Sequence, residues 1–538
     1  MLIEERLRNL VADERRFVEV RSADGGIATT HSYREVLAVA RSLTEQLSLI
    51  QERPRVGVVM GNTVAFVATD LALLLSGAVE VPVPVAFSAD QAQSLLEETL
   101  ICLVDDVGAE QLKAWGDRVL PAGCRVVHVD YPALADCARP AGPDSWPATS
   151  PWDDEAAICK IVHTSGTTSR PKGVLIRGAG VDALVRSMNR VMPAGAYRRY
   201  LSLVPFSLLV EQVAALYLVI RDAGSTVLLP PGEALVGTSS SAAAAVTRFI
   251  AVTEPTGLVV TPGLAGQLAV LADRAAAEGR DPVRALFGRP QAPVIACGGA
   301  PVDPATLDRL DSHGIAVHEG YGLSENSSAV CWNVPGDRRN GTVGRPLDHV
   351  EVSLGSDGEL LVRSTSLFAG YTRTDPSSCV VDDDGWLHTG DLAVIEDTGH
   401  IRIVGRKKNV IVTAAGRNVA PEWVEAQYAT LPFVHATAVV GDGLESLHAV
   451  FLITDGIDPG QALARIAAFG AERLSVVERA AVAYVLPATE DLYREFFTVT
   501  GRPRRDLVRD ALLAGRFPGV RLDDGTRREP LADAHPRS

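Results

Sequence analysis

Apolar residues alternate between helical spacing and short β-branched runs over the first 330 residues of the chain. The first four predicted elements are a serine-capped helix at 32–47, a strand at 55–60, a helix at 63–78 and a strand at 79–85. The same alternation returns at 201–229 and at 257–318. This order of elements is typical of mostly parallel sheets that are covered by helices.

The pattern changes after Gly341. Short alternating strands separated by Asp and Gly turns are predicted at 350–354, 359–364, 386–397 and 400–405. They predict an antiparallel sheet or small barrel. The polar, glycine-flanked segment GRKKN at 405–409 then predicts a domain boundary, and a smaller α+β unit follows it.

A chain of 538 residues is too long for one hydrophobic core, because single cores stop growing at about 250–300 residues. We expect an α/β protein whose domain 1–405 has two mostly parallel, helix-covered sheets and a small β-barrel-like subdomain. Residues 406–522 form the expected α+β C-terminal domain, and the polar tail 523–538 is expected to be disordered.

Composition narrows the class of protein. A net charge of −15 disfavours a general nucleic-acid binder but leaves room for a nucleotide ligand. The seven cysteines are scattered singly, which favours buried reduced thiols over a metal site or disulfides. The first 17 residues are charged and lack the apolar centre of a signal peptide, and no apolar run reaches ~18 residues. We expect a cytoplasmic protein without a membrane span.

The stretch IVHTSGTTSRPKGVLI at 161–176 combines a strand-like run with a turn rich in hydroxyls, glycine and one of only five lysines. Hydroxyls and backbone N–H groups on such a loop can surround phosphate oxygens, and a lysine adds charge. The stretch does not match the Walker A pattern GxxxxGK[ST]. By itself it fits a polar surface loop equally well.

The stretch resembles the phosphate loop of the adenylate-forming superfamily, which includes acyl-CoA synthetases, adenylation domains of nonribosomal peptide synthetases, and luciferases. The family pattern is roughly [YF]TSGTTGxPKG. The residues that match it are Thr164, Ser165, Gly166, Thr167, Thr168, Pro171, Lys172 and Gly173. Further motifs of the family follow in order, over about residues 30–510, and the long-chain acyl-CoA synthetase branch is the most similar.

Two of these motifs lie in the middle of the chain. GGAP at 298–301 resembles the segment that lines the acyl and adenine pockets, which implies nucleotide contacts for Gly299 and Ala300. GYGLSE at 320–325 resembles YGxTE. The resemblance implies that Tyr321 and Gly322 contact adenine, that Ser324 contacts the α-phosphate, and that Glu325 binds Mg²⁺, with Thr164 as a second metal ligand.

Two more motifs flank the predicted boundary. WLHTGD at 386–391 resembles [WF]xxTGD, which implies that Asp391 accepts hydrogen bonds from the ribose hydroxyls. In GRKKN, Arg406 matches an arginine that also holds the ribose, and Lys408 matches the hinge about which a mobile C-terminal lid domain rotates.

The reaction implied by the resemblance has two steps. The carboxylate of a small-molecule acid attacks the α-phosphate of Mg·ATP, and pyrophosphate leaves. A thiol, of coenzyme A or of a carrier protein's phosphopantetheine, then displaces AMP. Such chemistry needs positioned charge, for which the resemblance implies Lys172, Ser324, Glu325 and one more cation.

That last cation departs from the family. FTVTGRPRR at 497–505 aligns without gaps with LTPTxKxRR, so Arg502 stands where the lysine is expected. Arginine keeps the charge but is planar, forked and larger. Arg502 can act as a working substitute, can suit an unusual oxyanion such as nitrite that is passed to an aromatic amine, or can mark a catalytically impaired AMP-binding protein.

A second departure lies in VPFSLLVEQ at 204–212, where Leu208 replaces a histidine that shapes the acyl pocket. The change favours a non-standard acid, or is a packing change without consequence. Together with Gly298 and Ala329, Leu208 predicts a mostly apolar pocket. No aspartate stands where it would hold an α-amino group, which disfavours amino-acid activation.

Overall fold

The computed structural model describes residues 1–48, 53–139, 150–163, 172–236, 242–374, 378–412, 418–441, 444, 446–498 and 501–522. The predicted phosphate-loop residues Thr164, Ser165, Gly166, Thr167 and Thr168, and the tail 523–538, lie outside these ranges. Within the described ranges, no helix is both long and apolar enough to cross a membrane.

The first sheet has six strands in the order β6-β5-β3-β4-β7-β8. Its strands are β3 (Arg55–Val59), β4 (Val79–Pro82), β5 (Ile101–Val104), β6 (Arg125–His128), β7 (Ile158–His163) and β8 (Gly173–Arg177). All neighbours pair in parallel except β7 and β8, which form an antiparallel pair. This pair brings His163, directly before the predicted phosphate loop, opposite Gly173, its last residue.

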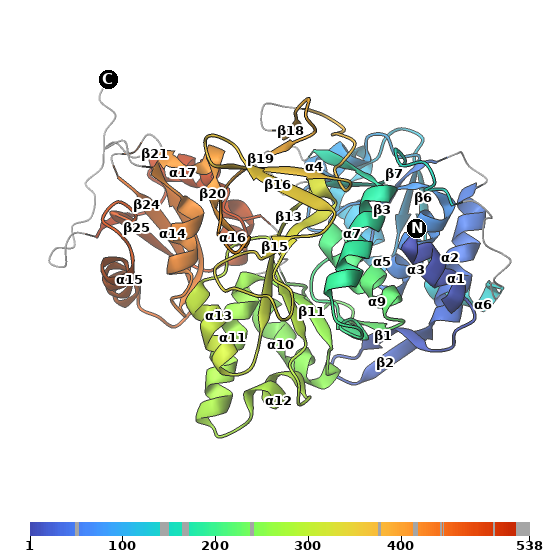
Figure 1. Cartoon of the computed structure of the whole chain (residues 1–538), viewed down its shortest axis with the longest axis horizontal. Helices are drawn as coiled ribbons and strands as arrows, with labels where there is room; N and C mark the ends of the chain where they lie inside the picture. Colours follow the sequence, from blue (N-terminus) through green and yellow to red (C-terminus); the bar gives the residue numbers. More distant parts are fainter. Residues whose placement is uncertain are drawn as a thin grey trace.

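Helices α2 (Tyr33–Ser48) and α3 (Val64–Ser76) pack against each other beside this sheet, as Figure 1 shows. Ser32 and Glu35 form a capping box at the start of α2. Helix α3 begins where the Thr63 side chain accepts a hydrogen bond from the Phe66 N–H, and ends at Gly77, whose φ of 72° is left-handed. Both helices were predicted within two residues of these bounds.

The second sheet has nine strands in the order β15-β14-β13-β12-β11-β9-β10-β1-β2. Their bounds are β1 (Arg16–Arg21), β2 (Ile27–Ser32), β9 (Arg199–Leu201), β10 (Ser225–Leu228), β11 (Gly257–Val260), β12 (Val294–Cys297), β13 (Val317–Leu323), β14 (Ser328–Trp332) and β15 (Arg345–Pro346). The strands from β13 to β1 pair in parallel, and β2, β14 and β15 pair antiparallel at the two edges. The prediction of two mostly parallel sheets is confirmed.

The third sheet is antiparallel and follows residue 341, as predicted. It consists of β16 (Val350–Leu354), β17 (Glu359–Ser364), β18 (Val380–Val381), β19 (Leu387–Ile395) and β20 (Ile401–Arg406). Strand β19 pairs with β17, β18 and β20. It is therefore the strand through which the TGD motif and the GRKKN motif meet.

The C-terminal part of the chain is a smaller α+β unit, drawn in orange and red in Figure 1. It contains β21 (Ile411–Val412), β22 (Asn418–Val419), α14 (Pro421–Tyr428), β23 (Val434–Val440), β24 (His448–Ile453), α15 (Pro459–Arg473), β25 (Val482–Pro487), α16 (Glu490–Phe496), α17 (Arg505–Leu513) and β26 (Val520–Arg521). Its buried residues form clusters separate from the large core of residues 3–401. The exact bounds 1–405 and 406–522 stay a prediction.

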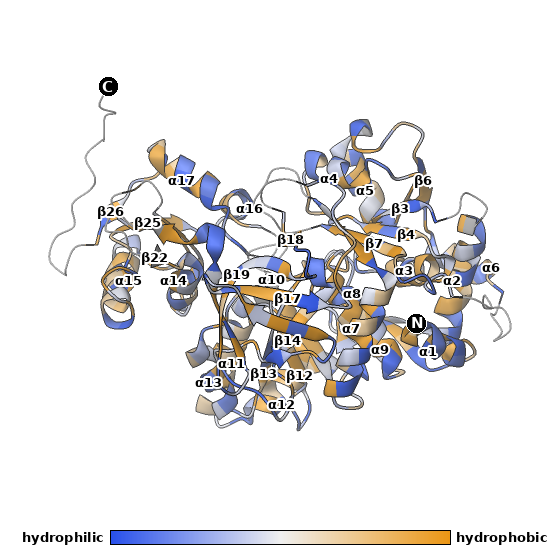
Figure 2. Ribbon diagram, turned by 45° about the horizontal axis from the view of Figure 1, so that its top comes forward, coloured by the Kyte–Doolittle hydropathy of each residue, from blue (hydrophilic) through white to orange (hydrophobic). Residues whose placement is uncertain are grey.

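Polar and apolar residues divide as this layering requires. Figure 2 shows apolar residues along interior strands such as β7 and β25, while surface helices such as α15 and α17 carry polar stretches. One buried exception is Lys160 on β7, which is 2% exposed and donates to Asp70 (2.6 Å) and to Glu80. Lys160 is therefore a structural lysine inside the core and not part of the predicted site.

Candidate active site

The candidate site lies beyond the carboxyl ends of β12 and β13, two adjacent parallel strands. Open α/β sheets bind ligands at this edge. Residues Gly298, Gly299 and Ala300 directly follow β12 and are exposed. Tyr321 and Gly322 lie near the end of strand β13, and a short 3₁₀ helix, η4 (Ser324–Asn326), follows directly. Both predicted motifs therefore lie at the same edge of the second sheet.

Gly322 has a steric reason to be glycine. A Cβ atom at this position would lie 1.8 Å from the carbonyl oxygen of Ser328. Any side chain would push β13 and β14 apart at the register shift between Tyr321 and Gly322. The small residue therefore keeps β14, which carries Ala329, close to the end of β13.

Asp391 is the centre of one half of the site. It lies in β19, is 3% exposed, and pairs across the sheet with Arg406 in β20. Its Oδ1 accepts from the Arg406 Nε (2.7 Å) and its Oδ2 accepts from the Tyr321 hydroxyl (2.6 Å). Burial and the neighbouring carboxylate raise the pKa of Tyr321 well above its usual value, so this hydroxyl stays protonated and donates. The structure brings these three predicted nucleotide-binding residues together.

Lys172 and Glu325 belong to the other half. Lys172 is buried, directly precedes β8, and donates from Nζ to the Ser378 Oγ (3.1 Å). Glu325 is 7% exposed, and its Oε1 accepts from the hydroxyl of Tyr371 (2.6 Å). The Lys172 Nζ lies 5.2 Å from the centre of the Tyr371 ring. Tyr371 was not predicted, and the dipeptide Gly370–Tyr371 was too short a signal to find it.

Arg502 reaches the site from the C-terminal unit. Its Nε (3.1 Å) and Nη2 (2.9 Å) both donate to the carbonyl oxygen of Gly299. The carbonyl oxygen of Arg502 accepts a hydrogen bond from the Thr498 N–H (2.8 Å). Burial and the nearby Arg406 lower the pKa of Arg502, although an arginine stays charged. The predicted cation therefore lies at the end of β12, where the nucleotide contacts are predicted.

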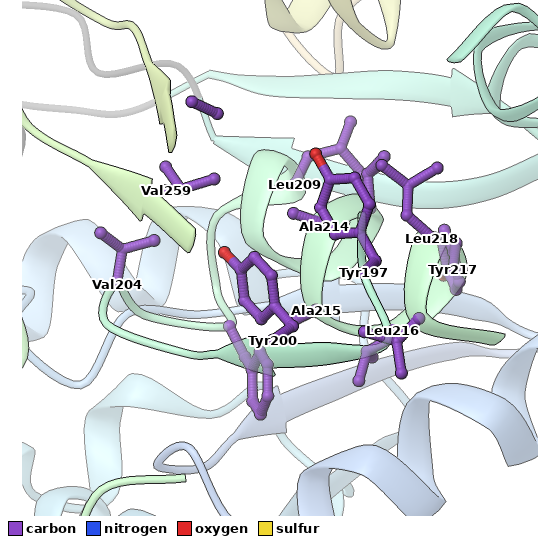
Figure 3. Close-up of a cluster of buried hydrophobic side chains, with 14 of the residues drawn as sticks. Tyr197, Tyr200, Val204, Leu209, Ala214, Ala215, Leu216, Tyr217, Leu218 and Val259 are labelled. Atoms are coloured by element: carbon purple, nitrogen blue, oxygen red, sulfur yellow. The ribbon is translucent and has the colours of Figure 1, made fainter. Parts of the chain in front are cut away.

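Leu208 lies beside the site rather than among these polar residues. It is half-buried and precedes helix α8 (Leu209–Gln212), which contacts β14. Three residues later, in α8, Glu211 is fully buried and accepts from the hydroxyls of Tyr200 (2.7 Å) and Ser202 (2.6 Å). Figure 3 shows the surrounding apolar cluster, with Tyr200, Leu209 and Tyr217 among its labelled side chains. Burial raises the pKa of Glu211 to about 8, so this wall carries a neutral acid at pH 7.

The predicted hinge residue Lys408 is exposed and lies in η5 (Lys407–Asn409), between β20 and β21. Its neighbour Lys407 pairs with Asp357 (2.5 Å) and Glu359 (3.4 Å). Glu359 also accepts from the Gly390 N–H (2.8 Å), directly before Asp391. Glu359 is a second site-supporting residue that was not predicted, because its contact with Gly390 depends on strand pairing.

The described residues fit a magnesium ion that is shared with a nucleotide. They contain no group of three or more His, Cys, Asp or Glu side chains that could hold a metal. Glu325 supplies a buried carboxylate at the edge of the site. Mg²⁺ is usually bound through one or two carboxylates and substrate phosphates, so a single carboxylate suffices. The second predicted ligand, Thr164, lies outside the described residues.

Several known proteins are similar to this chain in sequence or in fold. The chain is 40% identical over 156 residues to the long-chain-fatty-acid–CoA ligase FadD15 of Mycobacterium bovis, a match that covers 29% of this chain and 26% of that protein. It is 28% identical over 424 residues to the fatty-acid–CoA ligase fadD11 of Mycobacterium tuberculosis, covering 67% and 72%. The fold is similar to that of the anthranilate CoA ligase AuaEII, solved with anthranoyl-AMP, with a TM-score of 0.76 and 18% identity over 96% of this chain and 97% of that one.

The family itself is shown by a match along most of the chain. The sequence model described as "AMP-binding enzyme" covers residues 11–372. This range includes the predicted phosphate loop, the 298–301 segment and the 320–325 motif. The protein belongs to the AMP-binding enzyme family.

Proposed function

We propose that this protein joins a small-molecule carboxylic acid to a thiol in two steps. The acid oxygen attacks the α-phosphorus of ATP, the bond to the β-phosphate oxygen breaks, and pyrophosphate leaves. The sulfur of coenzyme A, or of a carrier protein's phosphopantetheine, then attacks the acyl carbon and AMP leaves. The observation that carries this proposal is the contact between Arg502 and Gly299, which adds a cation to the nucleotide-binding edge.

Each side chain has a distinct part in the first step. Tyr321, Asp391 and Arg406 would hold the nucleoside through their linked hydrogen bonds. Lys172 would bind phosphate oxygens, and Glu325 would hold Mg²⁺, which neutralises phosphate charge when bound. Arg502 would stabilise the negative charge that develops at the α-phosphate. Positioned charge of this kind accounts for most of the catalysis in phosphoryl-transfer reactions.

The proposed acid is apolar, either aryl or acyl. Leu208 and Ala329 supply apolar surface on elements that contact each other. Burial raises the pKa of the Glu211 carboxyl group in α8 to about 8. This group is therefore neutral at pH 7 and offers no negative charge to a cationic group on the substrate. The relatives are named for acids as different as long-chain fatty acids and anthranilate. Their names therefore leave the size of the acid open.

A second candidate is adenylation of a small oxyanion such as nitrite, with transfer to an aromatic amine. The forked use of Arg502 favours it, because two N–H groups of one guanidinium suit a planar oxyanion. A third candidate, an impaired protein that only binds AMP, is disfavoured by the intact Tyr321–Asp391–Arg406 network.

The test is exchange of labelled pyrophosphate into ATP, with fatty acids of several lengths and with aryl acids such as benzoate and anthranilate. We expect exchange with at least one acid, and an Arg502→Ala variant should lose it by at least about 100-fold, as for loss of one oxyanion donor. AMP release that requires nitrite and an aromatic amine would instead establish the second candidate. ATP binding without exchange or AMP release in any arm would leave only the AMP-binding protein.

A further inference from the structure

Tyr371 lies between the two charged side chains that the proposed reaction needs most. On one side its hydroxyl donates to the Glu325 Oε1 at 2.6 Å. On the other side its ring faces the Lys172 ammonium, whose Nζ lies 5.2 Å from the ring centre. One side chain therefore contacts both the carboxylate and the cation.

The backbone fixes Tyr371 in this place from both sides. Segment 368–372 pairs with the start of β8, because the Leu175 N–H donates to Gly370 (2.9 Å) and the Thr372 N–H donates to Gly173 (2.8 Å). An isolated antiparallel bridge joins Tyr371 itself to Val174. At its other end the Phe368 N–H donates to the carbonyl of Glu325 (2.8 Å). The segment thus connects the residue after Lys172 with Glu325.

The hydroxyl of Tyr371 has a defined direction. It accepts from the Cys379 N–H at 3.1 Å, so its own proton is left to point at Glu325. A hydrogen bond to Oε1 restrains rotation of the carboxylate. Among the described residues, no hydrogen bond or ion pair is formed by the other oxygen, Oε2.

The ring of Tyr371 acts on Lys172. An ammonium within about 6 Å of an aromatic ring is attracted by the negative face of that ring. Lys172 also donates to Ser378, one residue before Cys379, so the ring and the 378–379 segment hold the same ammonium. The lysine is thereby held beside Glu325 without forming an ion pair with it in the described structure.

We infer that Tyr371 is a positioning residue that couples the two halves of the phosphate site. Its hydroxyl orients Glu325 so that Oε2 is presented to the metal ion, and its ring holds Lys172 for the phosphates. The inference rests on the proposed use of Mg·ATP, and it assigns separate tasks to the two parts of one side chain. A substitution at Tyr371 that removes only the hydroxyl should therefore affect Glu325 and leave the contact with Lys172 in place.

The test compares Tyr371→Phe, which keeps the ring, with Tyr371→Leu, which loses both ring and hydroxyl. Binding of Mn²⁺·ATP is followed by electron paramagnetic resonance, and binding of ATP in excess EDTA by calorimetry, both without any acid substrate. For Tyr371→Phe we expect Mn²⁺·ATP affinity to fall about tenfold, the order for losing a hydrogen bond to a charged group, with metal-free ATP affinity unchanged. For Tyr371→Leu, metal-free affinity should fall as well.

Tyr428→Phe is the matched control. Its hydroxyl accepts from the Ala480 N–H at 3.3 Å in the C-terminal unit, away from the site, so both affinities should stay at the wild-type level. Thermal unfolding of all variants checks that they are folded. Unchanged Mn²⁺·ATP affinity in Tyr371→Phe would overturn the inference, and so would an equal loss of both affinities in that variant, which indicates a general structural role.

The same measurements separate this inference from the proposed function. If wild-type protein binds Mn²⁺·ATP and the variants behave as expected, the role of Tyr371 holds even when no acid supports pyrophosphate exchange. If an acid supports exchange but Tyr371→Phe has normal metal dependence, the proposed function holds and the role of Tyr371 fails. Absence of Mn²⁺·ATP binding by the wild-type protein would overturn both.

Discussion

Neighbouring lysines on the same pair of strands have unlike environments. Lys160 on β7 forms ion pairs with the carboxylates of Asp70 and Glu80 inside the core, and these two carboxylates balance its charge. Lys172, just before β8, contacts the Ser378 hydroxyl and the Tyr371 ring. Of these two lysines, Lys172 is the one to which the proposed function assigns an anionic ligand.

Glu319 allows a prediction at the same scale. It lies in β13 two residues before Tyr321, is 7% exposed, and its Oε1 accepts from the Val302 N–H at 3.3 Å, beyond the 298–301 segment. Burial raises the pKa of its carboxyl group from the usual 4.5 to about 7. Between these two values the folded state binds more protons than the unfolded state, so this group lowers stability as pH rises from about 4.5 to 7.

Glu319→Gln removes that dependence because an amide does not ionise. Relative to wild type, the free energy of unfolding of the variant should rise by roughly 1–3 kcal/mol between pH 5 and pH 8. Urea unfolding at pH 5, 6.5 and 8 measures the change. Glu5→Gln, on the exposed face of α1 (Leu2–Leu10), is the control and should show no comparable drift. A constant difference between wild type and Glu319→Gln would contradict the prediction.

At the scale of elements, features that depend on a local sequence pattern were predicted, and features that depend on long-range strand pairing were not. The predicted strands 350–354 and 359–364 coincide with β16 and β17, because alternation and Asp/Gly turns are local signals. The positions of Tyr321, Asp391 and Arg406 followed from motifs. Tyr371 and Glu359 were missed because their contacts, with Lys172 and Gly390, join strands that are distant in sequence. A π-helix at Val213–Tyr217 was also missed, since its apolar sequence resembles any buried helix.

The pairing of β17 with β19 leads to a prediction about nucleotide affinity. Glu359 is 6% exposed and accepts from the Gly390 N–H, so it fixes the β19 backbone directly before Asp391. Glu359→Ala should raise the Kd for AMP by about tenfold or more, the order expected for one hydrogen bond to a charged group. Asp357→Asn is the matched control, because it loses only the half-exposed ion pair with Lys407, and such pairs contribute about 0–1 kcal/mol. Calorimetry measures the affinity for AMP, and equal affinities in both variants would contradict the assigned role of Glu359.

At the scale of the whole molecule, polar contacts connect the region of Arg502 with the segment near the proposed hinge. Arg505, at the start of α17, pairs with Glu425 (2.5 Å) and Glu422 (3.3 Å) of α14. Glu422 also accepts from the Asn409 side chain (2.6 Å), directly after Lys408. Arg505, three residues after Arg502, is therefore connected through α14 to the segment that follows the proposed hinge. Rotation about Lys408 would remove Arg502 from Gly299.

This arrangement predicts that thioester formation requires backbone rotation at Lys408 and that adenylation does not. In the described state Arg502 already contacts Gly299, so adenylation requires no rotation. Proline fixes φ near −65°, so Lys408→Pro should leave pyrophosphate exchange within about threefold of wild type while thioester formation falls by more than about tenfold. Lys408→Ala keeps the backbone free and should retain both activities, since the side chain is exposed. Exchange and thioester product are measured in parallel, and thioester formation at the wild-type rate by Lys408→Pro would mean that the thiol reaches the adenylate without movement of Arg502.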